Sequence, residues 1–253
     1  GAIDFTRENE KEADRVGIQT LNNAGFDVRG ARDFFTTLKK ANQFSGGAAP
    51  AFLQTHPITS NRISDIEDRL KDYPYKQRLG NQTFYYVKGK LKALLGDKSN
   101  TKNILEENIK NKIYINEAGE RFALAYIYLM DNEFIKSQEQ IQWLFDNEQS
   151  NPMLSQLYIN YLIKTNKVTE AKKLYIQNLN FSPSNRSFIF GLADLYLRTQ
   201  ETEKALKLLK KNEQKFSQDP ILYNLYAKVY AKKGEKLLQY ENLAEAAYYN
   251  FNL

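Results

Sequence analysis

The sequence predicts an all-α protein in two parts, and three observations lead to this prediction. Apolar residues over positions 1–75 recur at the spacing of amphipathic helices. Small and aromatic residues over positions 76–253 recur every 34 residues, which is the period of a repeat architecture. Charge divides the chain at the same place, since residues 1–75 carry 10 basic and 11 acidic side chains and the remainder carries 26 and 19. We therefore expect two domains, 1–75 and 76–253.

Composition limits the chemistry that this chain can perform alone. Its 253 residues include no cysteine and one histidine, His56. A catalytic zinc site takes three protein ligands, mainly from His, Cys and carboxylates, so these counts argue against such a site within the chain. Thiol catalysis, disulfides and Fe–S clusters are excluded, and at most one Ser-His-Asp arrangement is possible. No nucleotide-binding glycine motif is present. No apolar run approaches the roughly 18 residues of a membrane-spanning helix, and the first residues lack the basic and then apolar pattern of a signal peptide. We therefore expect a soluble chain.

Three helices are expected in the first part. The first runs from Thr6, as N-cap, to Ala24, with Gly25 in the left-handed position after its end. The second follows Asp27 as N-cap, and the third starts near Ser60. Their apolar stripes are Val28, Ala31, Phe35 and Leu38 on the second helix, and Ile63, Ile66 and Leu70 on the third. The small residues of segment 42–57 fit a mobile lid and a plain connector equally well.

The second part contains columns of equivalent positions 34 residues apart. A degenerate helical pair over residues 82–113, turning near Gly96 and Asp97, precedes them. One column holds small or apolar residues: Ala125, Ile159, Ala193 and Ala227. A second holds turn-type residues: Asn132, Asn166, Gln200 and Gly234. A third, on the second helix of each unit, holds Ser137, Ala171, Ala205 and, as a departure, Gln239. Units of two antiparallel helices with this period resemble the tetratricopeptide repeat. We expect about four repeats stacked in a superhelix, the first degenerate and the last incomplete, with the aromatic residues in the core.

The C-terminal segment from Leu243 to Leu253 is amphipathic and aromatic. Terminal repeats of a solenoid need a polar outer face, which this segment lacks. We therefore expect a following helix or a packing partner here.

Two carboxylates on the first expected helix are the strongest candidates for chemistry. Glu10 and Asp14 lie four residues apart and therefore on one face of the helix, together with the small residues Ala13 and Gly17. Like charges at this spacing repel unless a positive group lies between or beside them. A solvated acidic patch neutralised by neighbouring basic residues is the plain alternative.

Three short motifs, in a fixed order along the chain, resemble those of a known family. They are N-E-x-E-A-D-R-x-G at Asn9–Gly17, A-G-F-D at Ala24–Asp27, and T-H-P-x-x-x-x-R-I at Thr55–Ile63. This order, followed by repeats, resembles bacterial gluzincin zinc metallopeptidases of the periplasmic beta-barrel assembly-enhancing group. In that family two histidines of an H-E-x-x-H helix and a later Glu bind zinc.

The resemblance implies roles for four residues. Glu10 matches the third zinc ligand, and Asp14 matches the acidic residue that accepts the second N–H of a metal-bound histidine. His56 is either an extra zinc ligand, a donor to the developing oxyanion, or merely structural. Arg62 either polarises a substrate carbonyl or pairs with Asp65 or Asp14, and we favour the pairing.

The family's H-E-x-x-H is absent from the chain. We therefore expect a fragment that starts inside a peptidase domain, with zinc in the full-length parent but none in this chain alone, and with no proteolytic activity of its own. Residues 1–75 should then leave an apolar face unburied and be mobile, rearranged or paired between chains.

The function implied for the parent is that of a zinc endopeptidase of the bacterial envelope or periplasm, peripheral to the membrane. Its repeats would dock unfolded or misassembled clients or the outer-membrane assembly machinery. The alternative is a non-catalytic repeat scaffold, in which Glu10 and Asp14 are unpaired surface residues. Nucleic-acid binding is disfavoured because the basic residues alternate with acidic ones. The positions expected to line the concave groove are Phe122, Tyr126, Asn160, Phe190, Asp194 and Lys228.

Overall fold

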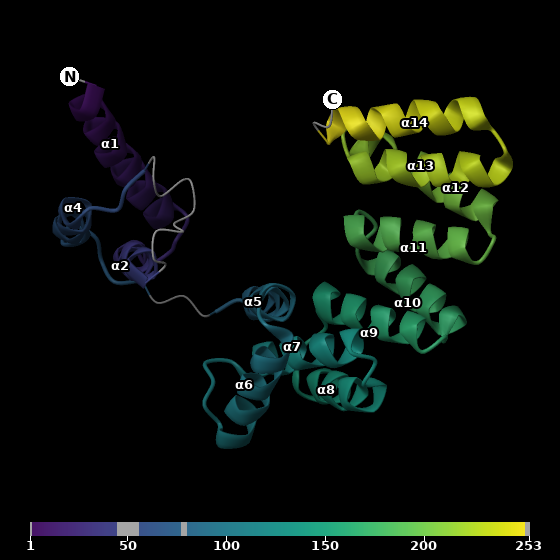
Figure 1. The fold of residues 1–253 in the computed structure, drawn as a ribbon, viewed down its shortest axis with the longest axis horizontal. Helices are drawn as coiled ribbons and strands as arrows, with labels where there is room; N and C mark the ends of the chain where they lie inside the picture. The colour runs from purple at the N-terminus through teal and green to yellow at the C-terminus, as the bar shows by residue number, and fades with distance from the viewer. Residues whose placement is uncertain (1, 45–55, 77–79, 251–253) are drawn as a thin grey trace. The chain divides into compact units, whose positions relative to one another are not determined.

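The computed structural model describes residues 2–44, 56–76 and 80–250, and within them the chain is all-α. It has thirteen α-helices and one short 3₁₀ helix over these residues, with no strand. This confirms the predicted fold class. The chain forms two compact units, residues 1–80 and 81–253 (Figure 1).

Three helices, α1 (Ala2–Asn23), α2 (Arg29–Phe44) and α4 (Ser60–Leu70), build the N-terminal unit. The prediction that Thr6 caps the first helix is wrong, because Ala2–Phe5 contain neither Gly nor Pro and the helix extends through them. The C-terminal prediction holds: Gly25 has φ +80°, and the Phe26 amide donates to the Leu21 carbonyl at 2.9 Å.

Side-chain caps set the starts of α2 and α4. The Asp27 carboxylate accepts the Arg29 amide at 3.0 Å, and the Thr59 hydroxyl accepts the Arg62 amide at 3.3 Å. Helix α2 extends through Phe44, so the expected loop 42–57 starts later than predicted. Residues 45–55, which carry its small side chains, lie outside the described residues.

The core of the N-terminal unit is small and open on one side. Ile18, Val28, Ala31 and Ile66 are its buried members. Beside them lies a cavity of about 670 Å³, lined mostly by apolar groups of α1 and α2. A Cβ added to Gly17 or Gly30 in its wall would meet nothing within 4 Å. The three helices therefore pack against one another and still leave an apolar face exposed.

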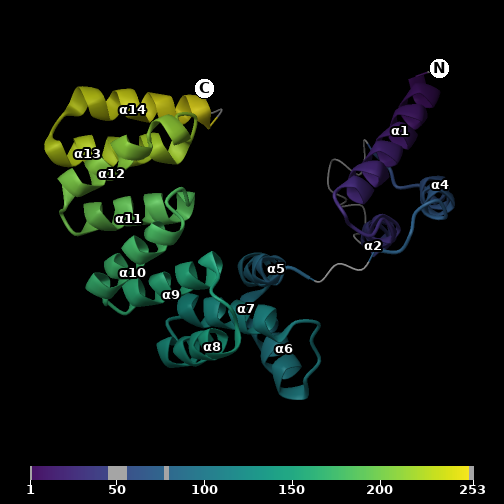
Figure 2. The same cartoon turned by 180° about the vertical axis from the view of Figure 1, so that it is seen from behind.

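Ten helices stack in pairs to form the C-terminal unit, as Figures 1 and 2 show from opposite sides. The first pair lies in the segment expected to form the degenerate repeat, and Asp97 caps its second helix. The helices are α5 (Gln82–Leu95), α6 (Lys98–Asn111), α7 (Glu117–Met130), α8 (Phe134–Asn147), α9 (Pro152–Lys164), α10 (Val168–Phe181), α11 (Arg186–Arg198), α12 (Thr202–Asn212), α13 (Pro220–Lys233) and α14 (Lys236–Tyr249).

The turn column marks the same backbone feature in four successive repeats. Asn132, Asn166, Gln200 and Gly234 all have left-handed backbone, with φ between 61° and 75°. In each repeat the amide of the following residue donates to the carbonyl five residues before it; the Glu133 amide, for example, donates to the Tyr128 carbonyl at 2.8 Å. The 34-residue period therefore reflects a repeated C-terminal cap between the two helices of each pair.

The small columns mark where paired helices cross. Ala125 and Ser137 are both fully buried, and the Ser137 hydroxyl donates to the Ala125 carbonyl at 2.9 Å. Ala171 and Ala205, at the equivalent second-helix positions, are also fully buried. A larger side chain would separate the two helices at this point.

Candidate functional site

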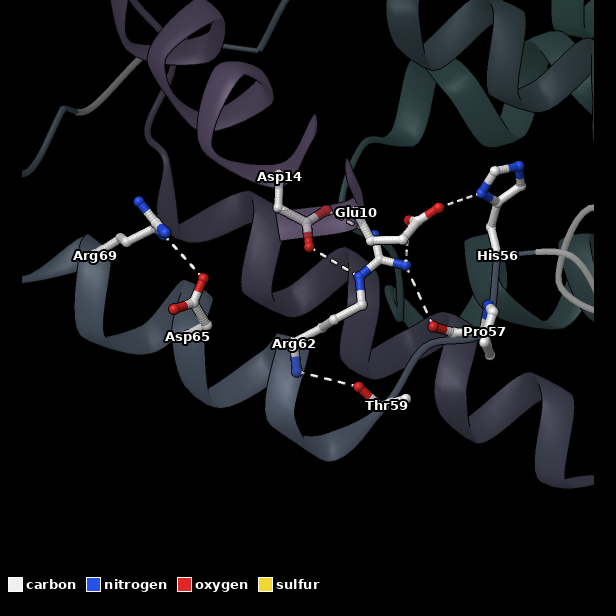
Figure 3. Close-up of polar contacts among 8 residues, drawn as sticks. All are labelled: Glu10, Asp14, His56, Pro57, Thr59, Arg62, Asp65 and Arg69. Carbon is white, nitrogen blue, oxygen red and sulfur yellow. Dashed lines mark hydrogen bonds and ion pairs between the residues drawn. The ribbon is translucent and has the colours of Figure 1, made fainter. Parts of the chain in front are cut away.

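Arg62 joins the two carboxylates of α1 (Figure 3). Its guanidinium donates to both oxygens of Asp14, from Nε at 2.8 Å and from Nη2 at 2.7 Å. Nη1 lies 2.7 Å from Glu10 Oε2 and also donates to the Pro57 carbonyl at 3.2 Å. A planar guanidinium thus satisfies a two-oxygen contact and a second carboxylate at once, which a lysine could not do.

The three charged side chains of this network are largely withdrawn from water. The side chains of Asp14, Arg62 and Glu10 are 6%, 12% and 15% exposed. The hydrogen bonds to Asp14 raise the pKa of Arg62 above its usual value, despite the opposing effect of burial. The Arg62 guanidinium also lies over the Phe35 ring, 5.1 Å from its centroid. Removing one member of this network should cost much free energy of folding, because the remaining members would be buried, unpaired charges.

Local structure explains why these groups meet. The i, i+4 spacing on α1 places Glu10 and Asp14 one turn apart on one face. Arg62 lies in the first turn of α4, which packs against α1, and its amide is held by the Thr59 cap. The network therefore depends on two elements separated by about fifty residues.

His56 approaches the same site from the chain before α4. Its Nδ1 contacts Glu10 Oε1, while the histidine side chain remains 60% exposed. Glu10 thus has one oxygen toward His56 and the other toward Arg62, as Figure 3 shows. The structure brings together all four residues that the sequence singled out.

Sequence reasoning identified part of the pairing. Arg62 pairs with Asp14, one of the two partners considered, whereas Asp65 pairs with Arg69 at 2.9 Å. The Arg62–Glu10 contact was missed, although two carboxylates one turn apart already indicated a cation between them. The structure contradicts the alternative in which Glu10 and Asp14 are unpaired surface residues.

The donor set can be tested against zinc. Glu10 and His56 offer a carboxylate and an imidazole, but both Asp14 oxygens accept from Arg62. The described residues contain no group of three or more His, Asp or Glu side chains placed to hold a metal ion. Since a catalytic zinc takes three protein ligands, these residues do not make a complete zinc site.

Four of the six predicted groove positions line cavities or their rim in the repeat unit. Tyr126, Asn160 and Asp194 line a cavity of about 280 Å³. Phe122 is buried, yet it lines a neighbouring cavity of about 250 Å³ that shares Tyr126 and Asn160. An unpaired buried oxygen, Gln156 Oε1, belongs to a residue in the wall of that second cavity.

The other two positions lie differently. Lys228 pairs with Asp194 at 2.8 Å and is exposed. Phe190 was predicted to line the groove, and this is wrong for its side chain. It is buried in the C-terminal core and packs on Phe216, with centroids 5.1 Å apart, because its side of α11 faces the next repeat.

No helix in the described part of the chain combines the length and apolarity required to cross a bilayer.

Two family models match the chain, one in each unit. Residues 1–70 match peptidase family M48, and residues 80–245 match ChAPs (Chs5p-Arf1p-binding proteins). The first match contains Glu10, Asp14, His56 and Arg62.

Individual relatives match different shares of the chain. The beta-barrel assembly-enhancing protease of Escherichia coli K12 is 26% identical over 211 residues, covering 83% of this chain and 43% of that protein. The mitochondrial metalloendopeptidase OMA1 of Danio rerio is 40% identical over 67 residues, covering 26% of this chain and 14% of that protein. The chain thus spans less than half the length of these curated relatives.

A solved structure supports the repeat fold. The tetratricopeptide repeat protein from Parabacteroides merdae matches with a TM-score of 0.55 and 15% identity, covering 94% of this chain and 92% of that one. At this identity the likeness concerns the fold alone.

Proposed function

Because the chain belongs to peptidase family M48 in its N-terminal unit and to the ChAPs family in its tetratricopeptide-like repeat unit, we propose that it forms part of a zinc-dependent endopeptidase of the bacterial envelope. The observation that carries this proposal is the withdrawn Glu10–Arg62–Asp14 network, with His56 on its open side. In this proposal the H-E-x-x-H helix belongs to the same protein but lies outside these 253 residues.

Glu10 is the proposed third zinc ligand. Arg62 and Asp14 position it: Arg62 holds one carboxylate oxygen at 2.7 Å, and Asp14 fixes the guanidinium through two hydrogen bonds. When bound, zinc would supply an activated water for hydrolysis of a peptide bond. Asp14 would orient a metal-bound histidine only through a rearrangement, since both its oxygens are occupied by Arg62 in this structure.

His56 is the proposed adjustable group of the site. It is exposed, it precedes Pro57 outside a helix, and it contacts the Glu10 oxygen that Arg62 leaves free. This position suits an additional ligand or a group that faces substrate. The imidazole would have to leave Glu10 before that oxygen could bind a metal.

The repeat unit is the proposed docking site for protein clients. Tyr126, Asn160 and Asp194 combine aromatic, amide and acidic groups along one surface, and such a mixture suits an extended polypeptide. The relative from Escherichia coli is named a beta-barrel assembly-enhancing protease, which favours clients concerned with beta-barrel assembly. The outer-membrane machinery as partner and a periplasmic location for the parent are part of this proposal.

Casein hydrolysis tests the first part of the proposal. The chain alone should not cleave casein, with or without added zinc, because its described residues lack a complete ligand set. Hydrolysis by this chain that a chelator abolishes would refute the expected inactivity.

A longer gene product that includes an H-E-x-x-H segment tests the site assignment. There Glu10→Gln should lower both bound zinc and casein cleavage, whereas Glu12→Gln, changed on the exposed side of the same helix, should alter neither. Full zinc content and activity in the Glu10→Gln variant would exclude Glu10 as a ligand.

A further inference from the structure

The repeat unit presents an exposed apolar helix face on its first helix, α5. Its large apolar residues there recur at helical spacing, opposite the buried residues Tyr86, Gly89 and Ala93 that face the rest of the unit. Helix α7 has the same length and buries nine residues, because neighbours cover it on more sides. The exposed face of α5 consists of Phe84, Val87, Leu91, Leu94 and Leu95.

The last helix, α14, presents a second such face. Ala246 is buried against the unit, whereas Leu237, Tyr240, Leu243 and Tyr248 are exposed. Both outer helices of the described repeats thus present an apolar face, where the terminal repeats of a solenoid usually present a polar one.

The repeat register shows what such a face contacts elsewhere in the unit. Leu206 and Leu209 lie 34 residues before Tyr240 and Leu243, and both are buried in the core that α12 shares with α13. Tyr240 is 65% exposed, against 8% for Leu206. Tyr240 and Leu243 of α14 thus occupy positions at which an earlier repeat meets its successor.

Interior junctions have a common construction: the second helix of one repeat packs on the first helix of the next. Tyr175 of α10 meets Phe188 of α11 edge-on, with centroids 6.2 Å apart. Phe145 of α8 likewise meets Tyr158 of α9 at 5.3 Å. Since α14 is a second helix and α5 is a first helix, their open faces are the two halves of one such junction.

Charge favours contact between unlike ends. Helix α5 carries three lysines and no acidic residue, whereas α14 carries two glutamates, Glu241 and Glu245, and one lysine. Like ends would bring together charges of the same sign beside the apolar stripe, and unlike ends would bring together opposite charges.

We propose that the chain associates head to tail with a second copy of itself, the α14 face of one copy packing on the α5 face of the next. The contact extends the repeat stack across the boundary between copies. It is heterologous, so each dimer keeps one free face of each kind and can add further copies. This proposal does not rest on peptidase activity.

Sedimentation velocity of the full chain tests the proposal over about a hundredfold range of concentration. The weight-average sedimentation coefficient should rise with concentration. Leu91→Glu on α5 and Tyr240→Glu on α14 should each raise the dissociation constant at least about tenfold. The matched control is Ile135→Glu, at an exposed apolar position of α8 away from both ends, and it should sediment as the wild type does.

Mixing the two end variants gives the decisive result. Each variant keeps one intact face, so an equimolar mixture should form a 1:1 dimer and stop there, at concentrations where neither variant dimerises alone. Lys88→Glu and Glu241→Lys should each weaken association, and combining both changes in one chain should restore it through the swapped charges. Circular dichroism melts of all variants check that these exposed substitutions leave the fold intact.

Three results would overturn the proposal. A wild-type chain that stays monomeric would mean that these faces are covered by another part of the chain or by a different partner. Association lost in Tyr240→Glu and retained in Leu91→Glu would indicate that α14 pairs with α14. The reverse pattern would indicate that α5 pairs with α5.

Discussion

Replacing Arg62 by methionine should unfold the N-terminal unit. The substitution keeps much of the aliphatic stem but removes two hydrogen bonds to Asp14 and the 2.7 Å ion pair with Glu10. Removing one partner of a buried ion pair costs about 3–5 kcal/mol, because the remaining charge stays desolvated. A unit of this size rarely has more than about 3–5 kcal/mol of stability. The expected loss is therefore comparable to its whole stability.

Hydrogen exchange measured by mass spectrometry would locate the effect. Amides of α1 and α4 should lose most of their protection in Arg62→Met, whereas amides of the repeat unit should keep theirs. Arg69→Met is the matched control: it breaks a pair with Asp65 on the same helix, but both side chains are about one third exposed, so its cost should be about 0–1 kcal/mol. Adding Asp14→Asn to Arg62→Met should recover part of the stability. Equal protection of the Arg62→Met and Arg69→Met variants would refute the assigned importance of the network.

Three further predictions concern the repeat unit. Gln200→Gly should stabilise it by about 1 kcal/mol, because Gln200 has φ +61° and glycine adopts this backbone without strain; an unchanged or lower urea midpoint would contradict this. Hydrogen bonds, chiefly from Lys172, lower the pKa of Glu201 from 4.5 to about 2. This carboxylate therefore contributes stability that is present above pH 4.5 and lost as the pH falls toward 2, so Glu201→Gln should flatten the acid side of the stability profile; an unchanged slope would argue against the assignment. Gly89→Ala would place Cβ 2.5 Å from the Gly119 carbonyl oxygen, so we expect a loss of about 1–3 kcal/mol in urea unfolding, where a gain would mean that α5 is free to move.

The repeat unit was largely predictable because its information is local. The left-handed positions Asn132, Asn166, Gln200 and Gly234 recur at a fixed period, since every repeat makes the same turn between its helices. The caps show the same regularity: Asn151, Asn185 and Asp219 each accept an amide at the start of a first helix. A chain that repeats one local solution allows the fold to be inferred from spacing alone.

Side-chain destinations within the repeats were less predictable. Phe190 and Tyr126 both lie on first helices, yet Phe190 is buried in the core and Tyr126 lines a cavity. Register places a residue on a helix face, but the superhelical packing of the next repeat decides whether that face is covered.

The sequence by itself determined the helical class, the 34-residue repeat, the turn positions and the presence of Glu10 and Asp14 on one face of α1. Only the tertiary structure decided which cation neutralises them. Asp14 lies 48 residues from Arg62, whereas Asp65 is close to Arg62 in the sequence, so sequence distance favoured the wrong partner. Packing of α4 against α1 resolves that choice. The Glu10–Asp14 pair is withdrawn from water, so it gains more free energy from a planar guanidinium that donates to two oxygens than the more exposed Asp65 would.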